Sequence, residues 1–195
     1  ADDRGVSVLL DAPARRVVAL APHLTEILFH IGGGGRLVGV MDHSDFPAAA
    51  QSLPRVGTHS RLDIEAILAL KPDLIVGWGS GNPTEDIALL ERLGLPVFIS
   101  EPRALADIST LMRRLGILID QASFARQRAA DFENGVNDLA VRYSSRRHLR
   151  VFYQVWEQPL YTLNREHIVS ELIADCGGAN IFADLAGLSP VVSLE

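Results

Sequence analysis

A proline within the stretch LDIEAILALKPDLIVGW (residues 62–78) constrains the fold of this chain more than any other feature. Pro72 cannot continue the helix that the preceding residues predict, because it has no amide proton and its ring clashes with the previous turn. The chain must therefore turn at Lys71–Asp73. It then enters Leu74–Val76, an apolar run without polar alternation. Such a run is typical of a parallel strand that is covered on both faces.

The same alternation of short apolar runs and helical patterns recurs through the first part of the chain. Strands are expected at 16–20, 37–40, 74–76 and 97–100, and helices within APHLTEILFHIGGGG, between Asp63 and Pro72, at 84–93 and at 104–116. Asp63 is placed to cap one of these helices. Alternating strands and helices predict a parallel α/β lobe, which we assign to residues 1–118.

The second part of the chain begins with a long helix. Residues 121–147 contain no proline and one glycine, which predicts a helix of about 20–26 residues, roughly 30–39 Å long. We assign residues 119–148 to a bridging helix and 149–195 to a partial second lobe. That lobe should hold a strand at 151–156, a helix within NREHIVSELIADCGG and a loop at ANIFADLAG. The expected fold class is α/β, with two Rossmann-like lobes, one bridging helix and a truncated second lobe.

Composition narrows the possible partners. The net charge of −6 argues against nucleic acid or an anionic membrane as the main partner. No apolar run reaches 18 residues, so no membrane span is predicted. One cysteine, Cys176, excludes an internal disulfide, and we expect it to be a small buried residue near a helix end. The start ADDRG fits either a terminus left by signal-peptide cleavage or an arbitrary chain start.

Candidate binding residues follow the predicted strands. Ligands of open α/β sheets usually bind beyond the carboxyl ends of the strands, where Pro22, His23 and Trp78 are expected. The only other tryptophan, Trp156, ends a predicted strand of the second lobe. Aromatic side chains offer a large contact area to a planar ligand at little entropic cost. Packing in the core is the alternative role for both tryptophans.

Two further histidines lie in predicted loops. His43 stands in MDHSD and His59 in VGTHS, so either is a surface residue, a ligand contact or a metal ligand. A small metal-dependent hydrolase using His43, Asp45 and His59 is therefore an alternative from another class. No zinc-binding spacing and no G-x-S-x-G nucleophile motif supports it.

Four segments together resemble a known family. RVVALAPHLTEILFHIG, VGVMDHSDFP, VGTHSRLDIEAILALKPDLIVGWGSGN and DCGGANIF, in this order, are similar to the periplasmic cobalamin-binding proteins. These belong to the siderophore, haem and corrinoid receptors of ABC importers. The resemblance implies a corrinoid held between two lobes, no catalysis and no cofactor. It also implies that the protein is a monomer and that it is secreted through a cleaved signal peptide. Its implied partner is a permease dimer in the membrane, to which it would deliver the ligand.

The resemblance assigns roles to individual residues. Trp78 matches a family tryptophan that contacts the ligand, and Trp156 or Val155 is the corresponding contact of the second lobe. His43 and His59 stand where the family has aromatic residues, which keeps a haem or ferric-siderophore ligand as an alternative.

Two acidic residues are implied to meet the permease. Glu65 and Glu195 stand where such receptors present one acid on each lobe. Asp63 and Glu65 also fit a simpler role, in which acidic residues complement the dipole at a helix start. The family continues beyond Glu195, so the second lobe is expected to lack most of its strands.

Overall fold

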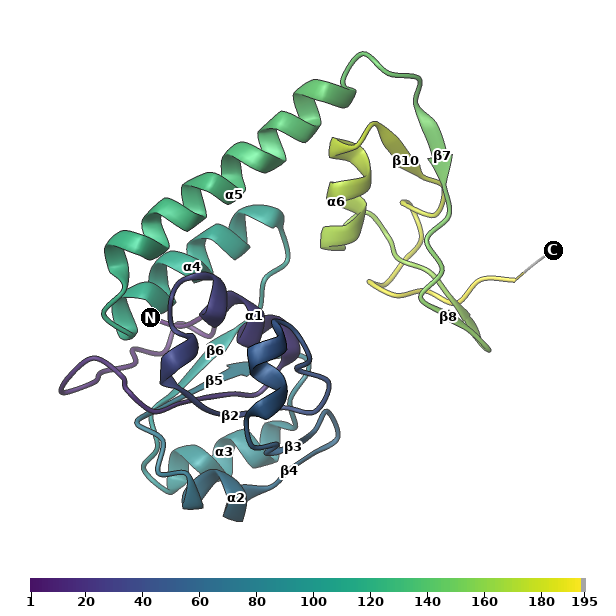
Figure 1. Cartoon of the computed structure of the whole chain (residues 1–195). Helices are drawn as coiled ribbons and strands as arrows, with labels where there is room; N and C mark the ends of the chain where they lie inside the picture. Colours follow the sequence, from purple (N-terminus) through teal and green to yellow (C-terminus); the bar gives the residue numbers. More distant parts are fainter. Residues whose placement is uncertain (194–195) are drawn as a thin grey trace. The chain divides into compact units, whose positions relative to one another are not determined.

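The computed structural model describes residues 1–193, which form two compact units. Unit 1 comprises Ala1–Glu101 and Leu111–Arg128, and unit 2 comprises Pro102–Thr110 and the chain from Ala129 onward. The alternation of strands and helices confirms the predicted α/β class (Figure 1). Among the described residues, no helix has both the length and the apolar character needed to cross a membrane.

Two helices contribute to both units. The first is α4 (Leu105–Leu118), and the second is α5 (Ala122–Tyr143), the long green helix in Figure 1. The long helix expected from the sequence is α5. It has 22 residues, which is within the predicted length.

Unit 1 is built on a four-stranded parallel sheet in the order β2-β1-β5-β6. Helices or short 3-10 turns connect successive strands, as parallel pairing requires. The strands are β1 (Val17–Ala19), β2 (Leu37–Val40), β5 (Leu74–Trp78) and β6 (Val97–Ser100). The helices between them are α1 (Pro22–His30), α2 (Ile64–Ala69) and α3 (Thr84–Arg92), with 3-10 turns at Gly34–Arg36 and Ala48–Ser52 and a small hairpin of β3 (Gly57–Thr58) and β4 (Arg61–Leu62).

The strand predicted after Pro72 lies at the centre of this sheet. Leu74, Ile75 and Val76 are fully buried, which confirms the expectation drawn from the continuous apolar run. Ile75 packs with Ile67 of α2 in one core cluster. On the other face, the guanidinium of Arg114 in α4 lies 5.0 Å from the ring centre of Phe98 in β6.

Hydrogen bonds hold both the helix before Pro72 and the turn after it in place. The Asp63 side chain accepts a hydrogen bond from the Ala66 amide (2.9 Å) and caps α2, as predicted. After Pro72, the Asp73 carboxylate accepts bonds from the Arg15 amide (2.8 Å) and the Arg16 amide (2.9 Å). The turn that follows α2 is therefore joined to the start of β1.

The N-terminal residues cover the outer edge of β6. The Asp3 amide donates to the Ile99 carbonyl (3.0 Å), and the fully buried Asp2 carboxylate accepts from the Ile99 amide (3.2 Å). That carboxylate also accepts from the amides of Arg4 (3.0 Å) and Val6 (2.9 Å) and from the Arg4 guanidinium (2.9 Å). Burial opposes ionisation, but these hydrogen bonds outweigh it and hold the pKa of Asp2 below its usual value.

Unit 2 contains a second, smaller parallel pair. β7 (Leu149–Val151) pairs with β10 (Gly178–Asn180), and α6 (Ile168–Asp175) lies between them in sequence. The Asn180 side chain donates to the Leu163 carbonyl and to the Ser170 hydroxyl, both at 2.8 Å. The asparagine of the DCGGANIF segment therefore has a structural role in this unit.

Three expectations for unit 2 are wrong. The strand predicted at 151–156 is β7 at Leu149–Val151, and Trp156 instead begins a separate hairpin of β8 (Trp156–Glu157) and β9 (Leu160–Tyr161). The predicted loop ANIFADLAG begins within a strand, because pairing with β7 extends a segment that lacks strong strand-forming residues. Cys176 is exposed at the C-terminal end of α6, a helix in which only Ser170 is buried.

Candidate functional site

Several of the predicted ligand contacts lie at one edge of the unit 1 sheet. Because all four strands are parallel, their carboxyl ends share this edge. Pro22 and His23 follow β1, His43 follows β2, and Trp78 ends β5. Trp78 is 37% exposed, whereas the residues before it in β5 are buried. The alternative that Trp78 is a core residue is therefore wrong.

Asn82 holds the end of β5 in place. Its side-chain oxygen accepts a hydrogen bond from the Trp78 amide (2.7 Å), and its side-chain nitrogen donates to the Leu20 carbonyl (2.8 Å). The residue is buried and links the carboxyl ends of two neighbouring strands. Sequence reasoning missed Asn82. Its position four residues after Trp78, in a loop that follows a strand, was the available signal.

His23 packs against Trp78. The two ring centroids are 5.3 Å apart and the ring planes are nearly perpendicular, at 88°, an arrangement that aromatic rings favour. The Nε2 atom of His23 is buried and has no hydrogen-bond partner among the described residues. Burial lowers the pKa of His23, and the charge of Glu101 opposes this shift only in part. The imidazole is therefore neutral at neutral pH.

The loop after Trp78 is joined to the end of β6. The Glu101 carboxylate accepts hydrogen bonds from the Ser80 amide (2.6 Å) and the Ser80 hydroxyl (2.9 Å). The Gly79 amide donates to the Ser100 carbonyl (3.0 Å). Glu101 was also missed, because a carboxylate that follows the next strand, 21 residues after Ser80, carries no sign in the sequence that it binds this loop.

His43 and His59 are both exposed, as expected of loop residues. His43 has a left-handed backbone conformation, with φ of 63°, and His59 lies in the turn between β3 and β4. The two loops meet through a hydrogen bond from the Asp42 amide to the Gly57 carbonyl (3.0 Å).

The predicted metal-binding trio is not assembled. Asp45 pairs with Arg55 at 3.1 Å, and across residues 1–193 no group of three His, Cys, Asp or Glu side chains has the geometry to hold a metal ion. The alternative of a hydrolase using His43, Asp45 and His59 is therefore not supported by the structure.

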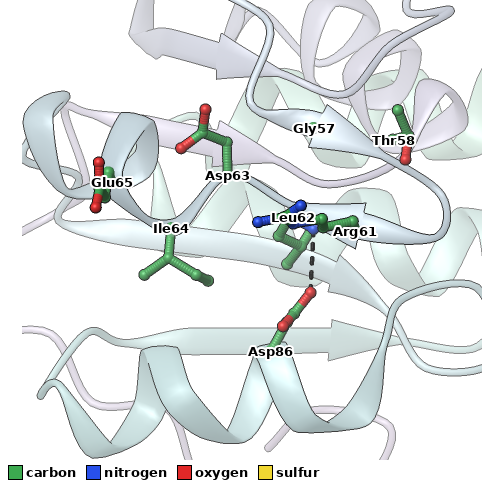
Figure 2. Close-up of a pocket in the computed structure, with 8 residues that line it drawn as sticks. All are labelled: Gly57, Thr58, Arg61, Leu62, Asp63, Ile64, Glu65 and Asp86. Carbon is green, nitrogen blue, oxygen red and sulfur yellow. Dashed lines mark hydrogen bonds between the residues drawn. The ribbon is translucent and has the colours of Figure 1, made fainter.

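Glu65 lies in the first turn of α2 and lines a surface groove of about 750 Å³ (Figure 2). The Asp86 carboxylate crosses to the hairpin and accepts a hydrogen bond from the Leu62 amide (3.0 Å), drawn as the dashed line in Figure 2. The groove is lined by Gly57, Thr58, Arg61, Leu62, Asp63, Ile64, Glu65 and Asp86. It contains no aromatic side chain, so the edge that carries Trp78 is the better candidate for binding a large planar ligand. Glu195 lies outside the described residues.

Trp156 in unit 2 is 63% exposed. The residue before it, Val155, donates its amide to the Tyr161 carbonyl (2.9 Å), which sets the start of the hairpin. Gln154, Val155, Trp156 and Glu157 line a shallow hollow of about 310 Å³. Trp156 is thus not a core residue of this unit.

The sequence matches a family model described as periplasmic binding protein over residues 17–195. The vitamin B12-binding protein of Vibrio cholerae serotype O1 is 41% identical over 183 residues, which cover 94% of this chain and 66% of that protein. The vitamin B12-binding protein of Yersinia pestis is 39% identical over 190 residues, with coverages of 96% and 68%. The chain thus spans about two thirds of the length of these relatives.

Solved structures show the same relationship. The periplasmic vitamin B12-binding protein BtuF of Vibrio cholerae superposes with a TM-score of 0.85 at 41% identity, over 93% of this chain and 71% of that one. A periplasmic heme-binding protein from Roseiflexus sp. RS-1 gives a TM-score of 0.78 at 29% identity, over 92% and 71%. The family model and the curated relatives agree with the resemblance seen in the four sequence segments. The chain belongs to the periplasmic binding protein family, and within it to the group of the vitamin B12-binding proteins.

Proposed function

We propose that this protein captures a corrinoid of the vitamin B12 type and delivers it to the permease of an ABC importer. The observation that carries this proposal is Trp78, an exposed indole at the carboxyl edge of a parallel sheet. Buried hydrogen bonds from Asn82 fix the backbone at this position. The curated relatives that share most of this chain are named for binding vitamin B12.

The chemistry of a corrinoid suits this edge. A corrin ring is broad and apolar and carries amide side chains at its rim. Trp78 offers an aromatic surface to the ring. The exposed imidazoles of His43 and His59 offer polar contacts to the rim. Pro22, which follows β1, is a further proposed contact, and His23 takes part through the indole that it contacts. In unit 2, Trp156 is the proposed second aromatic contact. These side chains bind and orient a ligand, and the proposal includes no catalytic step.

A haem or ferric-siderophore ligand is the second candidate. The observation in its favour is the pair of exposed histidines, His43 and His59, because imidazole is a good ligand for iron. The heme-binding protein of Roseiflexus also shares the fold, at 29% identity. The corrinoid remains the better candidate, since the relatives with higher identity over two thirds of their length bind vitamin B12 by name.

The proposed partner is a dimeric permease in the membrane. Glu65 is exposed on the first turn of α2 and is free to meet a basic residue of the permease. Glu195 is its proposed counterpart in the second lobe. We further propose that the protein acts as a monomer in the periplasm, after secretion through a cleaved signal peptide.

Ligand titration tests the corrinoid proposal. Cyanocobalamin and hemin are titrated separately into the full chain while tryptophan fluorescence is followed. We expect a saturable response to cyanocobalamin, and Trp78→Ala should weaken binding about 30-fold, because a central aromatic contact contributes about 2 kcal/mol. Surface-exposed Leu9→Ala serves as the control and should bind as the parent does. Saturable binding of hemin alone would refute the corrinoid and favour the second candidate.

A further inference from the structure

The loop after β5 lies directly against the indole of Trp78. If Gly81 carried a Cβ atom, that atom would overlap Cε3, Cδ2 and Cζ3 of the indole. Gly81 does not have a left-handed backbone conformation, unlike Gly57 or Gly94. Glycine is therefore required at residue 81 by the close approach of the indole and not by the backbone angles.

A second residue limits the movement of the same indole. His23 contacts it edge to face, with the ring centroids 5.3 Å apart. His23 is anchored because it stands in the first turn of α1, where the neighbouring Leu24 is fully buried. An indole with an imidazole on one side and a glycine backbone on another has few rotamers available.

The backbone that carries these contacts is itself held in place. Asn82 bonds to the Trp78 amide and the Leu20 carbonyl, and Glu101 bonds to Ser80. Gly81 thus lies between two anchored residues. Movement of the indole toward Gly81 would require breaking these bonds, and movement toward α1 would require moving His23.

We propose that Gly81 and His23 are positioning residues that hold the indole of Trp78 in a single orientation before the ligand arrives. This inference rests on the proposed function in one respect only, namely that Trp78 contacts the ligand. A side chain that is already ordered loses less conformational freedom on binding. Loss of this ordering should therefore weaken ligand binding about 3- to 10-fold without removing any direct contact.

The first test uses the full chain with Trp156→Phe, which leaves Trp78 as its only tryptophan. Trp156 is mostly exposed, so this change creates no cavity. In this background, Gly81→Ala should red-shift the ligand-free emission of Trp78 and increase its quenching by acrylamide. The matched control is Gly35→Ala, because a Cβ atom at Gly35 meets nothing within 4 Å. Emission and quenching that stay unchanged in folded Gly81→Ala would overturn the proposal.

The second test does not depend on the folding of Gly81→Ala. A protonated imidazole quenches a neighbouring indole, so the emission of Trp78 should fall as acidification protonates His23. The midpoint should lie below the usual value of about 6.5, because burial lowers the pKa of His23 and the negative charge of Glu101 restores it only in part. His23→Gln keeps a polar side chain of similar size and should abolish this fall in emission. If the full fall in emission persists in His23→Gln, the imidazole does not contact the indole.

Cyanocobalamin binding then separates the two proposals. If the parent protein does not bind but both ligand-free tests give the expected results, the proposed function fails and the positioning of Trp78 stands. If the parent binds and Gly81→Ala binds equally tightly despite a displaced indole, the link between positioning and affinity is refuted.

Discussion

The contribution of hydrogen bonds at the candidate site to the stability of the fold can be measured by replacing Asn82. Its side chain is buried and makes two hydrogen bonds, from the Trp78 amide (2.7 Å) and to the Leu20 carbonyl (2.8 Å). Asn82→Ala removes both bonds and leaves two main-chain groups without their partner. A change to alanine also removes little apolar contact, so the loss of hydrogen bonding should dominate.

The size of the effect follows from the surroundings of the two main-chain groups. A buried polar group left without a partner costs about 1–3 kcal/mol. Leu20 is fully buried, so its carbonyl should bear most of this cost, whereas Trp78 is 37% exposed and water can reach its amide. We therefore expect Asn82→Ala to lower the free energy of unfolding of unit 1 by about 2–4 kcal/mol.

Urea denaturation measures this change. In the Trp156→Phe background, the fluorescence of Trp78 reports on unit 1, and the midpoint should fall by about 1–2 M for a slope near 2 kcal/mol per M. Asn137→Ala, an exposed substitution on α5, should change the stability by less than about 0.5 kcal/mol. If Asn82→Ala lowers the free energy of unfolding by no more than Asn137→Ala does, Asn82 is not the link between β1 and β5.

Two further predictions concern unit 1. The folded-state pKa of Asp2 lies below its unfolded value of about 3.9, so its stabilisation is complete above that pH and is lost as the pH falls through the lowered folded value. Asp2→Asn should therefore flatten the fall in urea midpoint between about pH 5 and 3, and parallel curves for the two proteins would contradict this. At Gly57 (φ 130°), a Cβ atom would lie 2.5 Å from the Arg61 carbonyl oxygen, so Gly57→Ala should destabilise unit 1 by about 1–3 kcal/mol in thermal unfolding, compared with the unstrained Gly35→Ala. Equal melting temperatures for the two alanine variants would refute the strain at Gly57.

Features encoded by neighbouring residues could be predicted from the sequence. The limits of β2 and β6 agree with the predicted 37–40 and 97–100, because apolar runs between turn residues define strands locally. The cap at Asp63 was predictable since it requires only a residue three positions away. Trp78 was placed at a strand end, and the structure confirms its exposure. The resemblance to known receptors identified the family.

Contacts between distant residues could not be predicted in this way. β10 is a strand only because it pairs with β7 about 30 residues earlier, and the exposure of Cys176 depends on how little of α6 the rest of unit 2 buries. The roles of Asn82, Glu101 and Gly81 around Trp78 likewise depend on which strand ends become neighbours in the folded sheet.

The sequence by itself determined the α/β alternation, the break at Pro72 and an aromatic residue at the end of a buried strand, because each depends on the local pattern of side chains. Only the tertiary structure decided the strand order β2-β1-β5-β6. That order brings His23, which follows β1, and Glu101, which follows β6, to either side of the strand that ends in Trp78. Hydrogen bonding and packing between segments that are remote in sequence thus set the surroundings of the indole. The local sequence pattern does not encode the energies of these contacts.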